Sequence, residues 1–250
     1  MRPRPPFVSI IVPVFNEALL LPDFLARTRR LGDSIELIVV DGGSTDGSAA
    51  TALRLADKVI PAPRGRASQM NAGAAVARGE ILWFLHADST APPDASEKIR
   101  VALSDQRNAG GCFSLRYPRR EWIYRVSDTL GNIAVKIFGF ALGDHGIFCR
   151  RSAFCHAGGY PIVPILEDAE LYRRLARVGR MIQLPEEVVT DPRAFERSGR
   201  YRTTALYFLI LALYVLRVPI RGLNEIYCRC HRVEARAYAS RSGALRPAVS

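Results

Sequence analysis

The sequence predicts an α/β protein with a doubly wound, mostly parallel sheet and a helical segment at the C-terminus. Apolar, β-branched runs alternate with helix-length segments through residues 1–90, which is the pattern of a parallel sheet. The run Ile81–Leu85 is apolar at every position, as expected of a strand buried on both faces. It ends in His86-Ala87-Asp88, and the carboxyl ends of parallel strands are where such proteins bind ligands.

The first half of the chain repeats a strand followed by a helix. Short apolar runs bounded by turn residues predict strands over residues 7–15, 36–40, 58–60 and 81–85. The helices predicted between them run from residue 17 to a stop at Gly32, over 48–56, and over 67–78 with a stop at Gly79. A βαβαβ order with helices of this length implies right-handed crossovers.

The pattern changes after Asp88. A helix is predicted over 92–103, a strand over 110–117, and an amphipathic segment over 122–142 that Gly131 and Gly139 interrupt. A loop over 143–149 then feeds a strand. A last helix begins at Glu167, because the apolar residues at 171, 175 and 178 share one of its faces.

Residues 203–216 form a run without a charge, bounded by Arg202 and Arg217. Spanning a bilayer takes about 20 apolar residues, so this run is short for a transmembrane helix. Its flanking arginines and interleaved tyrosines favour a helix at an anionic membrane interface. A core helix and a helix between two subunits are the alternatives, so the sequence leaves oligomerisation open.

The formal charge of +11 favours an anionic partner such as a nucleotide or an acidic membrane surface. Nucleic acid is not expected, because the arginines are scattered and no recognition module is evident. The 5 cysteines make an odd count typical of reduced thiols, and no signal peptide precedes the first strand. We therefore expect a cytoplasmic protein, with peripheral contact at the inner face of the cell membrane.

Polar groups gather in four segments at predicted strand ends or helix starts: 13–17, 41–46, 65–71 together with 86–88, and 167–168. In order along the chain, these segments resemble the motifs of the family 2 glycosyltransferases, which have the GT-A fold. The resembling residues are Ser9-Ile10-Ile11-Val12-Pro13-Val14-Phe15-Asn16-Glu17, Val39-Val40-Asp41-Gly42-Gly43-Ser44-Thr45-Asp46-Gly47, Phe84-Leu85-His86-Ala87-Asp88 and Glu167-Asp168.

A closer likeness is to a bacterial subfamily of small stand-alone transferases. It rests on Gly65–Gly73, Gly143–Phe148 and Leu166–Leu171. The resemblance implies a GT-A domain over 1–200, with a nucleotide-binding half over 1–90 and an acceptor half over 91–200. Residues 201–250 would form the C-terminal helical segment and tail.

The resemblance implies where the nucleotide-sugar lies. Pro13, Phe15 and Glu17 would border the nucleoside, and Asp41 would accept a hydrogen bond from the base or ribose. An aromatic face beside a buried carboxylate suits such a pocket. Arg66 would lie near the diphosphate, and Asn71, His86 and Asp88 complete the nucleotide-sugar set. The alternative for Asp41 and Asp46 is turn and helix-cap chemistry, which we prefer for Asp46.

Asp88 matches the second acid of the family's Asp-x-Asp motif, whereas His86 replaces the first acid. The resemblance implies a divalent metal, Mg²⁺ or Mn²⁺, at Asp88 with His86 as a second ligand. Imidazole is a poor ligand for Mg²⁺ and a fair one for transition metals. The alternatives are that His86 contacts phosphate or packs in the core, and that Asp88 caps the next helix.

Asp168 matches the family's catalytic base, and Glu167 would orient it or the acceptor. Inverting sugar transfer needs one carboxylate to take the acceptor's proton. The alternative is that both acids only stabilise the N-terminus of their helix.

Asp144, His145 and the 122–142 segment are candidates for the acceptor side. No Gln-x-x-Arg-Trp motif is present, so a processive polysaccharide synthase is not expected. The predicted activity is transfer of one sugar from a nucleotide-diphospho-sugar, with UDP as the family's usual carrier, to a small or lipid acceptor hydroxyl. The rival interpretations are a nucleotidyltransferase and a non-catalytic nucleotide- or membrane-binding module.

Overall fold

A computed structural model describes residues 7–32, 34–119, 121–192 and 200–230. The chain divides into two compact units. The first comprises residues 1–162 and 166–192, and the second comprises residues 163–165 and 193–250. All candidate site residues lie in the first unit, so the site can be described within it.

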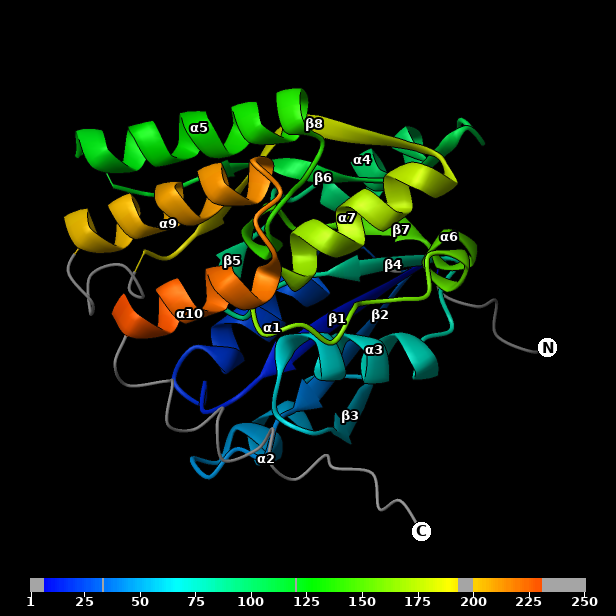
Figure 1. Cartoon of the computed structure of the whole chain (residues 1–250). Coiled ribbons are helices and arrows are strands. Elements are labelled where there is room, and N and C mark those ends of the chain that lie inside the picture. The colour runs from blue at the N-terminus through cyan, green and yellow to red at the C-terminus, as the bar shows by residue number, and fades with distance from the viewer. Residues whose placement is uncertain (1–6, 33, 120, 193–199, 231–250) are drawn as a thin grey trace, which may run out of the picture. The chain divides into compact units, whose positions relative to one another are not determined.

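An eight-stranded sheet in the order β3-β2-β1-β4-β7-β6-β8-β5 forms the centre of the first unit (Figure 1). Strands β1 (Val8–Val14), β2 (Ile35–Asp41), β3 (Lys58–Pro61) and β4 (Ile81–Phe84) pair in parallel. These strands confirm the βαβαβ prediction.

The other half of the sheet is mixed. Strand β7 (Phe148–Arg150) is antiparallel to both β4 and β6 (Asn108–Arg116), and the short β5 (Ser89–Thr90) is antiparallel to β8 (Arg180–Thr190). Strand β8 pairs in parallel with β6 and was not predicted. Its sequence carries a proline and two adjacent acids, and most of its residues are only partly buried, so it lacks the apolar run that marks the other strands.

Most predicted helices of the first unit are present, some with different ends. They are α1 (Leu21–Arg29), α2 (Ser48–Ala52), α3 (Arg66–Val76), α4 (Ala95–Ala102), α5 (Trp122–Phe138) and α7 (Glu167–Val178), together with the unpredicted α6 (Arg151–His156).

Two glycine predictions are wrong. Gly131 does not interrupt α5, and only Gly139 ends it, at a φ of 66°. Gly79 does not stop α3, because Ala77 is already extended. Gly79 instead packs against the backbone of Ser9, where a Cβ would lie 2.6 Å from the amide nitrogen.

The core has two layers, one on each face of the sheet. Ile10 and Val12 of β1 belong to the layer that includes α1 and α4, whereas Ile11 belongs to the layer that includes α3 and α7. Alternate residues of one strand thus face opposite layers, as the continuous apolar run predicts. Each fully buried large side chain contributes roughly 1.5–3 kcal/mol to folding, and the layers hold the strand ends in place.

Glu36 is a buried acid inside this framework. It accepts hydrogen bonds from the Ser9 hydroxyl and from the backbone and side chain of Arg78, and Lys58 Nζ lies 3.1 Å away. Burial acts to raise its pKa, but these donors outweigh burial and lower the pKa to about 2. Glu36 therefore ties β1, β2 and β3 to the turn before β4.

The second unit contains α9 (Arg200–Val215) and α10 (Ile220–Cys230). Arg202 donates to the Cys230 carbonyl, and the rings of Tyr207 and Tyr227 lie 6.4 Å apart. Helix α9 contains most of the predicted charge-free run. Among the described residues, no helix has the length and apolar character needed to cross a bilayer.

Candidate active site

His86 and Asp88 follow β4, where the buried strand gives way to a turn. His86 is buried, and its Nδ1 lies 3.5 Å from Oδ1 of Asp144. The other ring nitrogen, Nε2, is also buried and has no hydrogen-bond partner within the described residues, and the same holds for Oδ1 of Asp88. Two buried polar atoms, in side chains two positions apart in the sequence, thus lack a hydrogen-bond partner among the described residues, which is unusual in a protein interior.

Gly143 brings the His86 segment against the Glu167-Asp168 segment. It opens a short 3₁₀ turn, η1 (Gly143–His145), that carries Asp144. A Cβ on Gly143 would lie 2.7 Å from Nε2 of His86 and 2.7 Å from Oδ2 of Asp168, and would overlap the His86 ring. Only a residue without a side chain allows this close approach.

Glu167 and Asp168 begin α7 and are both buried. Leu166 before them has a φ of 63°, a left-handed conformation that a leucine rarely adopts. Burial, followed by the charge of Asp168, raises the pKa of Glu167. Arg66 at the start of α3 lies 3.9 Å from Glu167, with its own side chain largely exposed. The cluster therefore has a cation at its solvent side.

The acids and the imidazole influence one another. Burial and then the charge of Asp144 raise the pKa of Asp88. Burial alone would lower the pKa of His86, but the nearby acids, chiefly Asp144, raise it. Burial alone would raise the pKa of Asp144, but its contact with His86 lowers it. The site thus concentrates negative charge that a bound cation would neutralise.

Asp41 ends β2 at the predicted nucleoside position. Its Oδ2 accepts from the backbone N–H groups of Gly43 and Ser44, whereas its Oδ1 is buried and has no partner among the described residues. Asp41 thus stabilises the turn through Oδ2 and leaves Oδ1 available as a hydrogen-bond acceptor. Asp46 accepts from Ser48 and from the Ala18 backbone, which agrees with its predicted structural role.

The other predicted nucleoside residues line the same strand ends. Pro13 pairs with Val40 across β1 and β2, and the Glu17 backbone N–H donates to Ser48. The guanidinium of Arg64 lies over the Phe15 ring, 3.7 Å from its centroid. The aromatic face is thus paired with a cation that sequence reasoning did not identify.

The sequence profile of the family described as Glycosyl transferase family 2 matches residues 9–154, more than half of the chain. The chain belongs to this family. An undecaprenyl-phosphate 4-deoxy-4-formamido-L-arabinose transferase of Sodalis glossinidius is 30% identical over 244 residues, covering 88% of this chain and 71% of that protein. The protein of that name from Pseudomonas paraeruginosa (strain DSM 24068 / PA7) is 31% identical over 165 residues, 60% of this chain and 48% of the relative. The chain thus spans about half the length of several curated relatives it matches.

Solved glycosyltransferases share the fold. A mannosyltransferase from Pyrobaculum calidifontis, in complex with GDP-Man and Mn²⁺, superposes with a TM-score of 0.64 at 22% identity, covering 96% of this chain and 76% of that one. Glucosyl-3-phosphoglycerate synthase from Mycobacterium tuberculosis, in complex with Mn²⁺, UDP-glucose and phosphoglyceric acid, superposes with a TM-score of 0.61 at 18% identity. The match covers 85% of this chain and 80% of that one. The predicted GT-A fold is confirmed.

The predicted metal ligands of this family 2 glycosyltransferase, Asp88 and His86, do not form a complete site among the described side chains. No three His, Cys, Asp or Glu side chains of the described ranges are grouped so as to hold a metal ion. His86 Nε2 and Asp88 Oδ1 are nevertheless buried and partnerless, and a ring nitrogen and a carboxylate oxygen are chemically suited to bind a cation. Oxygen atoms of a donor diphosphate would supply the remaining ligands.

Three further residues of the predicted site are Asn71, His145 and Asp144. The Asn71 amide donates to the Tyr160 carbonyl and accepts from the Tyr160 N–H, so both its polar atoms hold that backbone. His145 is buried, and burial lowers its pKa to about 4, so it is neutral at pH 7. Asp144, predicted on the acceptor side, contacts His86 instead and also accepts a 3.3 Å hydrogen bond from Tyr117.

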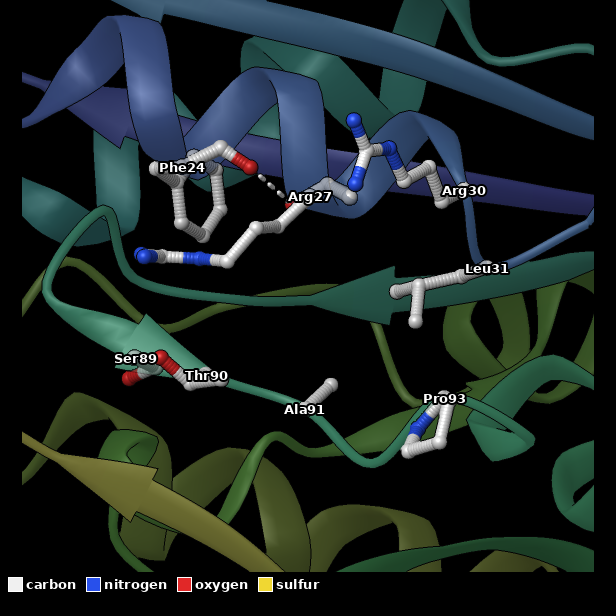
Figure 2. Close-up of a pocket in the computed structure, with 9 residues that line it drawn as sticks. Phe24, Arg27, Arg30, Leu31, Ser89, Thr90, Ala91 and Pro93 are labelled. Atoms are coloured by element: carbon white, nitrogen blue, oxygen red, sulfur yellow. Dashed lines mark hydrogen bonds between the residues drawn. The ribbon is translucent and has the colours of Figure 1, made fainter.

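A cavity of about 200 Å³ lies away from these groups, between α1 and residues 89–93 (Figure 2). Arg27 and Arg30 line it, but its buried hydroxyls are already paired. Thr28 donates to the Phe24 carbonyl, and Ser89 bonds Thr190. The cavity contains neither His86 nor Asp168 and presents no partnerless acceptor, so it is not the active site.

Proposed function

We propose that the protein transfers a sugar from a nucleotide-diphospho-sugar to a lipid-borne acceptor, with inversion at the anomeric carbon and with a divalent cation at Asp88 and His86. One observation carries the proposal: Nε2 of His86 and Oδ2 of Asp168 each lie 2.7 Å from the same point above Gly143. A cation site beside a carboxylate is what departure of a diphosphate and attack by an acceptor require.

The residues divide the reaction between them. Asp41 Oδ1 accepts a hydrogen bond from the nucleoside, and Arg66 attracts the diphosphate from the solvent side. Asp168 takes the acceptor's proton while the acceptor oxygen attacks opposite the leaving group. Glu167, whose pKa is raised by burial and by the charge of Asp168, can orient the acceptor. When bound, the cation supplies Lewis-acid neutralisation of the leaving diphosphate.

The relatives support a lipid acceptor, since their names specify undecaprenyl phosphate. The type of acceptor oxygen changes the demand on Asp168. A hydroxyl must lose a proton during attack, whereas a phosphate oxygen is already anionic at pH 7. Loss of Asp168 should therefore cost much more with a hydroxyl acceptor than with a lipid phosphate.

A thermal-shift panel tests the donor site. Nucleoside diphosphates are added with and without Mn²⁺ to the native protein and to Asp88→Ala. A ligand at about 100 times its Kd adds roughly 2.7 kcal/mol of stability, a clear rise in Tm. We expect one nucleotide to stabilise the native protein only with Mn²⁺, and Asp88→Ala to lose that response. No shift with any nucleotide and metal would contradict the proposal.

A further inference from the structure

Helix α5 exposes an apolar face along its length. Trp122, Val126, Leu130, Ile133 and Ile137 recur at helical spacing and are all exposed, from 37% for Val126 to 69% for Ile137. Residues three or four apart lie on one side of a helix, so these five side chains form a continuous stripe. We call this stripe the α5 apolar face.

The opposite side of α5 is fixed to the sheet. Ile123, Tyr124, Ala134 and Val135 are buried there. The Asn132 side chain donates to the Leu115 carbonyl and accepts from the Leu115 N–H, and Asp128 accepts from the Tyr117 N–H. Helix α5 thus packs against β6 (Figure 1), and these hydrogen bonds fix which of its sides faces the sheet. The apolar face is left on the exposed side.

The charges on α5 are sorted as well. Arg125 and Lys136 are exposed and lie along one edge of the apolar face. Within α5, all of which the structure describes, the acid is Asp128, which is half-buried and bonded to β6. Apart from Glu121, which is exposed at the N-cap, the exposed side of the helix therefore combines large apolar groups with the positive charges of Arg125 and Lys136, as does a helix that lies in an anionic membrane interface.

Charge argues against a second copy of this chain as the occupant. The whole chain carries +11, and pairing two α5 apolar faces would bring the Arg125 and Lys136 edges of both copies together, two cations per copy against one exposed acid, Glu121 at the N-cap. Anionic lipid headgroups neutralise these cations while the acyl region covers the apolar face.

The apolar residues of α9, the segment predicted to contact membrane, are not sorted to one side in this way. Leu206, Ile210 and Tyr214 are buried, whereas Leu209 is exposed between them. Because apolar residues of α9 lie on both a buried and an exposed side, this helix does not have the two-sided character of an interfacial helix. Helix α5 is thus the better membrane-binding element.

We propose that α5 binds the surface of an anionic bilayer through its apolar face and its Arg125–Lys136 edge. The inference rests on the proposed function, since a lipid acceptor requires the site to lie near a membrane. The site is close to α5: the chain runs from Gly139 at its end directly into Gly143 and Asp144. A Cβ on Gly131, within α5, would lie 3.7 Å from the ring of His145.

Intrinsic fluorescence provides a direct test, because the two tryptophans differ. Trp122 is 62% exposed on the α5 apolar face, whereas Trp83 is fully buried in the core. The full chain is titrated with phosphatidylcholine vesicles with or without phosphatidylglycerol, some carrying brominated acyl chains. We expect a blue shift and bromine quenching with the anionic vesicles, and loss of both in Trp122→Phe.

A matched pair of variants locates the binding surface. Ile137→Asp places a charge on the α5 apolar face, and Leu53→Asp places one at an equally exposed leucine elsewhere, 68% against 69%. We expect Ile137→Asp to weaken anionic-vesicle partitioning more than tenfold and Leu53→Asp to leave it unchanged. Reversing both charges, Arg125→Glu with Lys136→Glu, should abolish it.

Three outcomes would overturn the inference: no shift of Trp122 fluorescence, equal loss in both aspartate variants, or equal binding to neutral vesicles. A fourth such outcome comes from sedimentation without vesicles: a dimer that Ile137→Asp dissociates. A second copy of the chain would then cover the α5 apolar face. None of these assays contains nucleotide. If vesicle binding fails while the nucleotide thermal shift persists, the membrane inference falls and the proposed donor chemistry stands.

Discussion

Nδ1 of His86 lies 3.5 Å from Oδ1 of Asp144; the His86 ring is buried, and the Asp144 carboxylate is half-buried. A carboxylate beside one imidazole nitrogen favours the tautomer that carries its proton there. The lone pair is then on Nε2, the atom without a protein partner. At the position where the Asp-x-Asp motif has its first acid, this chain thus presents an imidazole nitrogen whose ring is held by an acid.

Replacing Asp144 by asparagine should weaken metal binding. The variant keeps the shape of the side chain but removes the charge that orients His86, and loss of such a supporting group typically costs 10–100-fold in metal affinity. Calorimetric titration with Mn²⁺ in the presence of the stabilising nucleotide measures the change. Asp94→Asn, at an exposed acid outside the site, is the control. Unchanged Mn²⁺ affinity in Asp144→Asn would show that Asp144 does not support a metal ligand.

Asp168→Asn should lower kcat by about 10²–10⁴ with a hydroxyl acceptor, the usual contribution of a general base, and leave nucleotide affinity unchanged. Steady-state transfer assays and the thermal shift measure the two quantities. Glu170→Gln removes another acid from the first turn of α7 and controls for effects on the helix terminus. A non-catalytic binding module would be indifferent to both changes.

Asp41→Asn should weaken nucleotide binding by roughly 5–150-fold, the effect of about 1–3 kcal/mol for an unsatisfied buried partner. An asparagine can keep its oxygen on the Gly43 and Ser44 N–H groups. Its NH₂ group then replaces the Oδ1 acceptor, so a donor on the nucleoside meets another donor. Kd values for the stabilising nucleotide, with circular dichroism as a check on folding, decide the outcome. Equal affinity would remove Asp41 from the nucleoside site.

Glu36 should stabilise the fold in a pH-dependent way. Its pKa falls from 4.5 to about 2 on folding, so its contribution is complete above pH 4.5 and is lost as the pH falls from 4.5 through 2. This shift corresponds to about 3 kcal/mol. Urea unfolding should therefore show Glu36→Gln to be destabilised by about that amount at pH 7, with a smaller difference at pH 3. A difference that does not change with pH would indicate that packing, rather than charge, accounts for the loss.

The sequence was sufficient for the parallel half of the sheet, because its strands are continuous apolar runs with turn residues at their ends. The same periodicity predicted the helix that starts at Glu167. It did not predict β8, whose Pro185 and neighbouring acids obscure a strand pattern. The antiparallel direction of β7 is a property of long-range pairing, which no local pattern encodes.

The site was predicted in part for similar reasons. Strand ends placed Asp41, His86 and Asp88 at one sheet edge, as the structure also has them. The contact of Asp144 with His86 joins segments far apart in the sequence and depends on a turn that only tertiary packing defines. The Arg64 side chain over Phe15 has no sequence signature beyond a basic loop.

Because Gly143 has no side chain, His86 and Asp168 can lie close to each other across it. Any side chain at 143 would clash with the His86 ring and with Asp168, so the two segments could no longer approach each other as they do here. A related sequence could keep the His-Ala-Asp and Glu-Asp motifs intact and still be unable to assemble them. The residue at position 143 therefore decides whether a chain that has both motifs can also form this site.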